Sequence, residues 1–556
     1  MRASLPAPRR GAAGAVRRQA TPGRGSAKLG PAPVTHPRTF AVALLVPLVA
    51  ISAAGAVIGV QLLTSLGVTP NTALIGALLA MLLGRLPVAG LRVFRSMHAQ
   101  NLAQSAMSAA TFGAANSLLL PIGVPWLLGR ADFVLPLLAG VAAAMFLDAW
   151  MLYRLFGSRI FPAEGAWPPG LAAAEAIRAG DAGGRHAAVL VGSLAAGALG
   201  AWLSLPMSAF GTAFIGNAWA LSMFGVGLLA SGYSAAVAGV SLQALYVPHG
   251  MMIGAGLVAL GQVVAQLRQT PAGGARPDDA RLAADVRVGA TLRAGAAAYL
   301  VIAAGIALAG GLQASMSPGA LVLFVVYAAL AAYVHELLVG LAAMHSGWFP
   351  AFAVALITLL IGMSLGFPPT ALALLTGFSV ATGPAFADMG YDLKAGFVLR
   401  GRGADAAFEL DGRRQQFLAA SVAFATALVV VLLTWRGYFA AGLVPPVAKV
   451  YVATIGAGVA PGVAGSLLLW AVPGGLLQLS GGSRRQLGVL LSTGLLIANP
   501  TAGWGVLAGI AVRLVWARVL ARPSGALEVV AAGFIAGDAL WSFGDAVMKP
   551  RARGGA

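Results

Sequence analysis

The sequence predicts an all-α, polytopic bundle of transmembrane helices, and three observations support that fold class. Hydrophobic residues make up 59% of the 556 residues, charged residues only 10%, and the mean hydropathy is +0.85. A soluble fold could not cover its surface with so few polar groups. The apolar stretches are long and continuous rather than alternating. This favours helices over barrel strands, because lipid cannot hydrogen-bond the backbone.

Sixteen apolar stretches follow one another along the chain. Each was compared with the roughly 20 residues that a helix needs to cross the bilayer. The count is good to about two, so we expect about 14–16 spans. The stretches are residues 40–63, 71–86, 100–128, 132–156, 187–206, 209–231, 235–264, 290–312, 318–343, 349–364, 368–387, 416–435, 447–474, 485–500, 502–520 and 526–547.

Basic residues gather in the tails and in the loops between apolar stretches. Residues 1–38 carry eight basic residues and no acidic one, which predicts a disordered cytoplasmic tail. Residues 549–556 form a second basic tail, so both termini of this multi-pass protein are expected on the cytoplasmic side of an inner membrane. Between the tails we expect two transmembrane halves, residues 39–265 and residues 290–548, joined by a cytoplasmic loop at residues 266–289.

The net charge of +19 could suggest a nucleic-acid partner. A nucleic-acid surface requires a continuous basic face with interleaved aromatic residues, and the sequence has no such stretch. The basic residues instead follow the positive-inside pattern of membrane proteins. We therefore expect the lipid bilayer, and no nucleic acid, as a partner.

Counting crossings by the positive-inside rule fails in two places. Full crossings throughout residues 185–266 would put the following basic loop outside, and the same conflict arises within residues 484–550. A broken, re-entrant or half-length segment must therefore lie within residues 161–264, and a second one within residues 484–550. Irregular regions at corresponding places predict an internal repeat of two halves. WPPGLAAA at 167–174 and FPPTALAL at 367–374 are a weak sequence echo of such a repeat.

Acidic residues at membrane depth are candidates for function, because an ionisable side chain there is costly and usually faces a wet cavity. The candidates are Asp148, Glu175, Glu336, Asp388, Asp392 and Asp538, with His249 and His335. Carboxylates at this depth commonly load and release protons, whereas an interface position or a pair with arginine is the structural alternative. We predict Glu175, Glu336 and Asp388 as proton-coupling residues, with H⁺ as the coupling ion.

Enzyme and cofactor signatures are weak. YVHELLVGLAAMHSGW at 333–348 resembles the HExxH zinc motif, but Val339 stands at the second histidine. Cysteine is absent, and so is the phosphate-cradling GxxxxGK[ST] loop. We expect no cofactor, no metal site and no enzyme activity. An intramembrane enzyme is the alternative from a different class.

Three segments, in order along the chain, resemble the oligopeptide transporter family. QNLAQSAMSAA from Gln100 resembles an early Asn-x2-Gln segment. FPAEGAWPPGLAAAEAIRAGDAGG at 161–184 resembles the aromatic-Pro-x-Gly-x-Ala-x-Ala-Glu segment, with Pro169 in place of the family's carboxylate. FADMGYDLKAGFVLRGRG and the following GRRQQ, at 386–416, resemble the Asp-x3-Asp-Leu-Lys-x-Gly stretch and its basic Gln-Gln, with GADAAFELD as an insertion.

The resemblance implies a secondary active transporter that imports oligopeptides or related small solutes with protons. A metal-chelate carrier of the same family is the alternative, for which His249, His335 and the Met-rich 247–256 would be contacts. The expected midplane site lies between segments 167–175 and 367–392. The predicted substrate-binding residues are Asn101, Gln104, Trp167, Gly170, His249 and Phe367, and the structural or gating residues are Pro168, Pro169, Asp392 and Lys394.

Two further expectations concern a helix start and assembly. The Pro-Pro-Gly segment at 168–170 should leave N–H groups free at a helix N-terminus, which would bind a substrate carboxylate. GVAPG at 458–462 can seat a close helix crossing within one protomer or between protomers. A homo-oligomer is therefore left open.

Overall fold

The computed structural model describes residues 35–66, 72–182, 184–268, 279–347, 351–458, 462–518 and 525–548. The predicted tails, except for residues 35–38, lie outside these ranges, as do residues 269–278 of the predicted loop and 459–461 of GVAPG. From His36 onward the described residues form one compact unit of helices. The predicted all-α, polytopic class is confirmed.

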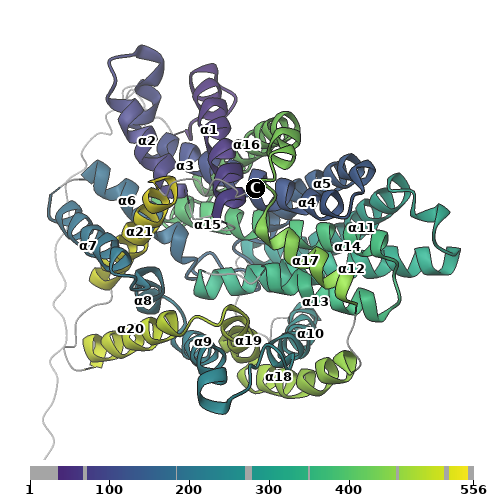
Figure 1. Cartoon of the computed structure of the whole chain (residues 1–556). Coiled ribbons are helices and arrows are strands. Elements are labelled where there is room, and N and C mark those ends of the chain that lie inside the picture. The colour runs from purple at the N-terminus through teal and green to yellow at the C-terminus, as the bar shows by residue number, and fades with distance from the viewer. Residues whose placement is uncertain are drawn as a thin grey trace, which may run out of the picture. The chain divides into compact units, whose positions relative to one another are not determined.

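The part of the chain up to Arg268 forms α1 to α10 and three short 3-10 or π-helical segments (Figure 1). Their bounds are α1 Val42–Leu66, α2 Ala73–Arg85, η1 Ala89–Arg95, α3 Met97–Phe112, η2 Gly113–Leu119, α4 Leu120–Leu127, η3 Ala131–Phe133, α5 Val134–Leu155, α6 Pro168–Ala182, α7 Gly184–Trp202, α8 Met207–Ile215, α9 Ala218–Ala238 and α10 Val247–Arg268.

The rest of the chain forms α11 to α21. Their bounds are α11 Asp279–Ala309, η4 Leu312–Ala314, α12 Pro318–Ser346, α13 Ala351–Ser364, α14 Pro369–Ala381, α15 Pro384–Leu399, α16 Ala406–Ala440, α17 Pro446–Ala457, α18 Val463–Arg485, α19 Leu487–Ile497, α20 Pro500–Arg518 and α21 Gly525–Met548.

Many of these helices are long and apolar enough to cross a membrane. Among the described residues there are ten such spans, and seven further apolar helices have 10–17 residues. Several predicted spans have boundaries that cross from one helix into the next, and two of them show why. Stretch 209–231 covers parts of both α8 and α9, because Asn217 caps the start of α9 with its side chain. Stretch 447–474 covers α17 and part of α18, because Gly458 (φ 74°, ψ −179°) ends α17.

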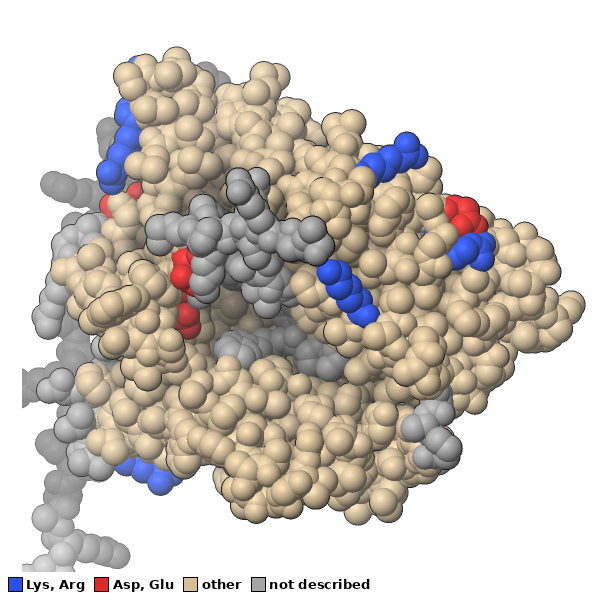
Figure 2. All heavy atoms as spheres, in the orientation of Figure 1, with Lys and Arg blue, Asp and Glu red and all other residues tan. Residues whose placement is uncertain are grey.

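The outer helices expose large apolar side chains. Val237 is 84% exposed, Leu433 79% and Val42 75%. Figure 2 shows that charged side chains occupy few places on the face it draws. Exposure of this kind is unfavourable in water and expected against lipid tails. The surface thus agrees with a membrane-embedded, multi-pass protein.

Two spans lie at the centre and are interrupted. In the span Met97–Leu127, made of α3, η2 and α4, all of an apolar 18-residue stretch is buried, and the corresponding share is 94% for Pro369–Leu399, made of α14 and α15. In the first, Gly113–Leu119 is π-helical, a distortion that is frequent at functional sites. In the second, Gly383 (φ 99°, ψ −47°) breaks the helix immediately before Pro384. These are broken segments of the predicted kind, surrounded by protein rather than lipid.

The helices too short to cross the bilayer by themselves include α8 and α19. α8 has 9 residues and α19 has 11, whereas a crossing needs about 20. Each lies between two longer helices, α8 between α7 and α9, and α19 between α18 and α20. These are the regions in which charge counting required an irregular segment.

The helices on either side of α8 and α19 pair in reverse order. α7 packs against α21, α8 against α20, α9 against α19 and α10 against α18. The last three pairs lie in the lower part of Figure 1. A two-fold relation that exchanges α7–α10 with α18–α21 generates this order.

Glycine crossings obey the same exchange. A Cβ on Gly254 of α10 would lie 1.8 Å from Ala471 O of α18, and a Cβ on Gly537 of α21 would lie 2.1 Å from Leu194 O of α7. A Cβ on Gly474 would lie 2.2 Å from Met251 O, and one on Gly197 would lie 2.7 Å from Phe534 O. Only glycine permits these approaches. The contacts therefore support the predicted repeat in these eight helices.

The predicted sequence echo lies outside these eight helices. Pro168 and Pro169 begin α6, and Phe367-Pro-Pro precedes α14. The echo therefore stays a prediction. The domain boundaries of the two halves stay predictions.

Candidate functional site

One face of α3 is polar and points at α15. Asn101, Gln104, Ser105 and Ser108 recur at helical spacing and are buried. Asn101 Nδ2 donates to Gln104 Oε1 at 2.8 Å, and Gln104 Nε2 donates to Asp392 Oδ1 at 2.5 Å. Ser108 Oγ donates to Asp388 Oδ1. α3 therefore binds two carboxyl groups of α15 with neutral donors.

Asp388 and Asp392 lie one helical turn apart on α15, and each is at most 1% exposed. Within the described ranges, the second carboxyl oxygen of each, Oδ2, has no hydrogen-bond partner, and neither has Asn101 Oδ1. Buried acceptors without donors are costly. This cluster of oxygen atoms therefore suits protons or a cationic group of a ligand. The name "acidic centre" is used below for Asn101, Gln104, Ser108, Asp388 and Asp392.

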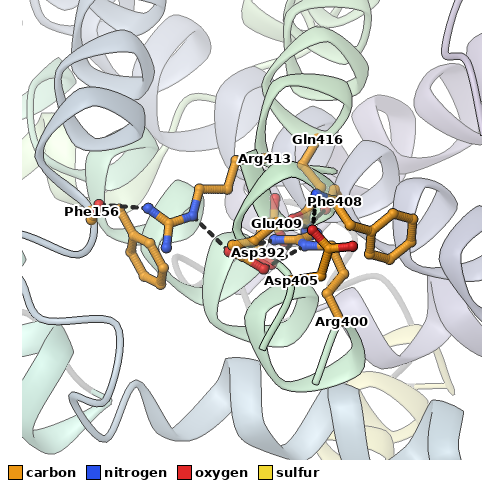
Figure 3. Close-up of polar contacts among 9 residues, drawn as sticks. Phe156, Asp392, Arg400, Asp405, Phe408, Glu409, Arg413 and Gln416 are labelled. Atoms are coloured by element: carbon orange, nitrogen blue, oxygen red, sulfur yellow. Dashed lines mark hydrogen bonds and ion pairs between the residues drawn. The ribbon is translucent and has the colours of Figure 1, made fainter. Parts of the chain in front are cut away.

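The end of α15 carries a different polar cluster (Figure 3). Arg400 donates to Glu409 through Nε at 2.8 Å and Nη2 at 3.1 Å, and Arg413 Nε donates to Glu409 Oε1 at 2.6 Å. Arg400 Nη1 also donates to Gln416 Oε1 at 2.7 Å. Gln416 Nε2 in turn donates to Asp392 O at 2.6 Å. This "arginine cluster" of Arg400, Glu409, Arg413 and Gln416 fixes the start of α16 to α15.

Trp167 packs on the side of α15 away from α3. Its backbone has φ 40°, which is rare for a residue with a side chain. Its buried ring lies so close to Gly390 that a Cβ there would sit 2.1 Å from the indole. Phe156, Phe161 and Tyr391 surround the ring. Trp167 Nε1 has no hydrogen-bond partner among the residues that the structure describes, so the indole can donate to a ligand.

The start of α6 differs from the prediction. The N–H groups of Gly170 and Leu171 donate to Trp167 O at 3.0 Å and 3.2 Å, and Pro168 and Pro169 have no N–H. The expectation of free N–H groups for a substrate carboxylate is therefore wrong at these residues. Gly170 serves close packing instead, since a Cβ would lie 2.2 Å from Tyr391 O.

Lys394 ties the loop before α6 to α15. Its Nζ donates to Ala163 O at 3.0 Å, and the ammonium lies 5.7 Å from the centre of the Phe397 ring. These contacts support the structural role predicted for Lys394, which stays a prediction.

A second carboxyl cluster lies at the break between α14 and α15. Tyr299 OH lies against Asp148 Oδ1 and 2.8 Å from Glu336 Oε2, and Gly383 N donates to Asp148 Oδ2 at 2.9 Å. All three side chains are buried. The name "tyrosine cluster" is used below for Asp148, Tyr299 and Glu336. Sequence reasoning listed both acids but missed Tyr299, because a tyrosine in an apolar helix has no local signal of function.

Three predicted residues lie elsewhere. Glu175 on α6 pairs with Arg178 at 3.1 Å. His249 lies on α10, which packs against α18. Phe367, before α14, packs on Phe324 and Tyr327. The structure thus brings together Asn101, Gln104, Asp388 and Asp392 but separates Phe367 from Trp167.

Interrupted, fully buried helices that bring unpaired carboxyl groups into the membrane define a class: polytopic α-helical transport proteins. A comparison with family models narrows this. Residues 239–549, more than half of the chain, match the OPT oligopeptide transporter protein family, and the chain belongs to that family. The matched region includes Asp388 and Asp392, whereas the resemblances at Gln100 and at 161–184 precede it. No curated protein matches the chain.

Proposed function

We propose that this oligopeptide-type transporter imports short peptides or related small solutes across the inner membrane, driven by protons. The observation that carries the proposal is the acidic centre. Asp388 and Asp392 each keep one buried oxygen without a partner in the described residues, on a helix that lipid does not touch. Carboxyl groups in this setting are expected to exchange ligands during transport.

Electrostatics gives the acidic centre a reason to bind a positive charge. Two carboxylates one turn apart repel each other, and burial strengthens the repulsion. A proton on one carboxyl, or the ammonium group of a peptide between them, removes it. The neutral donors on α3, Gln104 and Ser108, hold the two carboxyl groups in place without neutralising them.

Glu336, Asp388 and Glu175 are the proposed proton-coupling residues. Asp388 belongs to the acidic centre and Glu336 to the tyrosine cluster. Glu175 is buried, but its partner Arg178 has a side chain that is 40% exposed. Trp167, Asn101 and Gln104 are the proposed substrate contacts, with Gly170, His249 and Phe367 as more distant ones.

A transport assay tests the proposal. Purified protein in liposomes is expected to take up a labelled tetrapeptide when the outside is made acidic. The uptake rate of Asp388→Asn is expected to be lower than that of the wild type by at least about tenfold. Asp132→Asn is the matched control, because Asp132 pairs with Arg130 at an exposed loop. Equal uptake by wild type and Asp388→Asn would remove Asp388 from the mechanism.

The same assay separates the alternatives. Uptake of a labelled iron–siderophore complex in place of the tetrapeptide would establish the metal-chelate carrier, for which His249 and Met251 are the proposed contacts. Chemical conversion of the peptide without movement across the membrane would establish an intramembrane enzyme. Reporter fusions after residues 1 and 556 test whether both termini are cytoplasmic.

A further inference from the structure

The tyrosine cluster joins three helices to the break in a fourth span. Asp148 comes from α5, Tyr299 from α11 and Glu336 from α12, and Gly383 N–H lies at the start of α15. In the part of the chain that the structure describes, Asp148 and Glu336 are connected through the single hydroxyl of Tyr299. The proton count of this cluster can therefore be worked out from its hydrogen bonds.

Tyr299 has one proton and can donate to only one carboxyl group. Both oxygens of Asp148 have a donor in reach, the tyrosine hydroxyl and Gly383 N–H, so Asp148 fits an ionised carboxylate that accepts from Tyr299. With the tyrosine proton in that bond, the contact of 2.8 Å between Tyr299 OH and Glu336 Oε2 is a hydrogen bond that Glu336 donates.

The other oxygen of Glu336 agrees with this assignment. Glu336 Oε1 is buried and has no hydrogen-bond partner in the part of the chain that the structure describes. The carbonyl oxygen of a neutral acid tolerates this better than a carboxylate oxygen does, because a charged acceptor loses more on burial. The cluster thus holds one transferable proton and one negative charge.

No cation balances that charge. Among the described side chains, neither Asp148 nor Glu336 has an ion pair with Lys, Arg or His. Nearby titratable groups on the packed helices include Tyr333, whose ring lies 6.3 Å from that of Tyr299; His335, which bonds to Ser379; and Asp388, which bonds to Ser108. The Asp148 carboxylate is instead stabilised by the positive end of the α15 helix dipole, through the hydrogen bond from Gly383 N–H.

We propose that Asp148 and Tyr299 are further coupling residues, and that Glu336, Tyr299 and Asp148 form a proton relay that latches the N-terminus of α15. In the step, Glu336 Oε2 gives its proton to Tyr299 Oη while Tyr299 gives its own to Asp148 Oδ1. Two O–H bonds break, one at Glu336 and one at Tyr299, and two form, one at Tyr299 and one at Asp148, so the negative charge moves from Asp148 to Glu336. Protonated Asp148 is a weaker acceptor for Gly383 N–H, so the latch on the break loosens. This inference rests on the proposed proton-driven transport.

Infrared spectroscopy tests the resting state without transport. The spectrum of the purified wild type at neutral pH is expected to contain the C=O band of a buried protonated carboxyl group. Because Asp388 or Asp392 can contribute a band of the same kind, the wild-type spectrum is subtracted from that of each variant. Glu336→Gln should show a loss of C=O intensity, whereas Asp148→Asn should not. No loss in Glu336→Gln, or a loss only in Asp148→Asn, would overturn the assignment of the proton.

Transport tests the relay itself. Tyr299→Phe keeps the ring but removes the hydroxyl, so acid-driven peptide uptake should fall at least about tenfold, while exchange of labelled for unlabelled peptide without a proton gradient should stay within about twofold. Tyr327→Phe is the matched control, since its hydroxyl donates to Thr358 O outside the cluster. Wild-type uptake and pH response in Tyr299→Phe would refute the relay.

The two layers of hypothesis fail differently. If the wild type shows no acid-driven uptake of peptide, the proposed function fails, and the infrared result still decides where the proton lies. If the wild type takes up peptide and Tyr299→Phe takes it up equally well, the relay is refuted but the proposed function stands. If Tyr299→Phe does not fold, the spectrum of Glu336→Gln decides the inference.

Discussion

The buried acids near the end of α15 and those along the middle of the protein are treated in opposite ways. Glu409 receives three hydrogen bonds from Arg400 and Arg413. Asp388, Asp392 and the tyrosine cluster are equally buried, but in the described residues they meet only neutral donors. A carboxylate bound by two arginines is committed to holding the fold. One bound by neutral groups remains able to exchange a proton or a ligand.

The largest expected effect would come from the arginine cluster. Glu409→Ala leaves the fully buried Arg400 without its charged partner, which should cost about 3–5 kcal/mol of folding stability. Thermal unfolding in detergent measures this loss. A stability equal to that of the wild type would show that the arginine cluster does not hold α16 to α15. The distinction between structural acids and exchangeable acids would then be wrong.

Asp388→Asn should give the reverse result. Peptide uptake should fall at least about tenfold, yet the thermal midpoint should not fall. The amide can keep the bond from Ser108, and one buried charge without an ion partner is removed. The measurement pairs uptake in liposomes with thermal unfolding. Marked destabilisation by this substitution would place Asp388 with the structural acids.

Glu175→Gln tests a residue that lies between the two classes. Its arginine is partly exposed, so loss of the pair should cost no more than about 1 kcal/mol. If Glu175 takes part in coupling, acid-driven uptake will fall while the protein stays folded. Asp181→Asn, an exposed position on the same helix, is the control. Unchanged uptake in Glu175→Gln would remove that residue from the mechanism.

The smallest effect is expected at Asp411. Its ion pair with Arg38 is short, 2.7 Å, but the arginine side chain is 58% exposed. Asp411→Ala should therefore change the folding stability by less than about 1 kcal/mol. The comparison with Glu409→Ala in one unfolding series isolates the contribution of burial, because both acids lie on α16. Equal losses would mean that burial does not decide the strength of these pairs.

Local sequence features predicted much of the fold and part of the site. Long apolar stretches predicted the helices, and charge counting predicted irregular segments where α8 and α19 lie. The helical spacing of Asn101 and Gln104 and of Asp388 and Asp392 placed each pair on one face. By contrast, Trp167 and Phe367, whose segments we expected to line one site, lie apart. The Pro-Pro pattern indicates only that a helix begins, and not where that helix packs.

By itself, the sequence determined that this chain must satisfy its backbone within helices in lipid and that it can afford few charges there. It also determined which helix faces are polar. The tertiary structure decided which polar faces meet. Gln104 reaches Asp392 across 288 positions of the chain, and Asp148 reaches Tyr299 across 151. Such contacts depend on how interrupted helices pack. Hydropathy and residue spacing do not predict this packing, because an apolar helix surface fits many neighbours equally well in lipid.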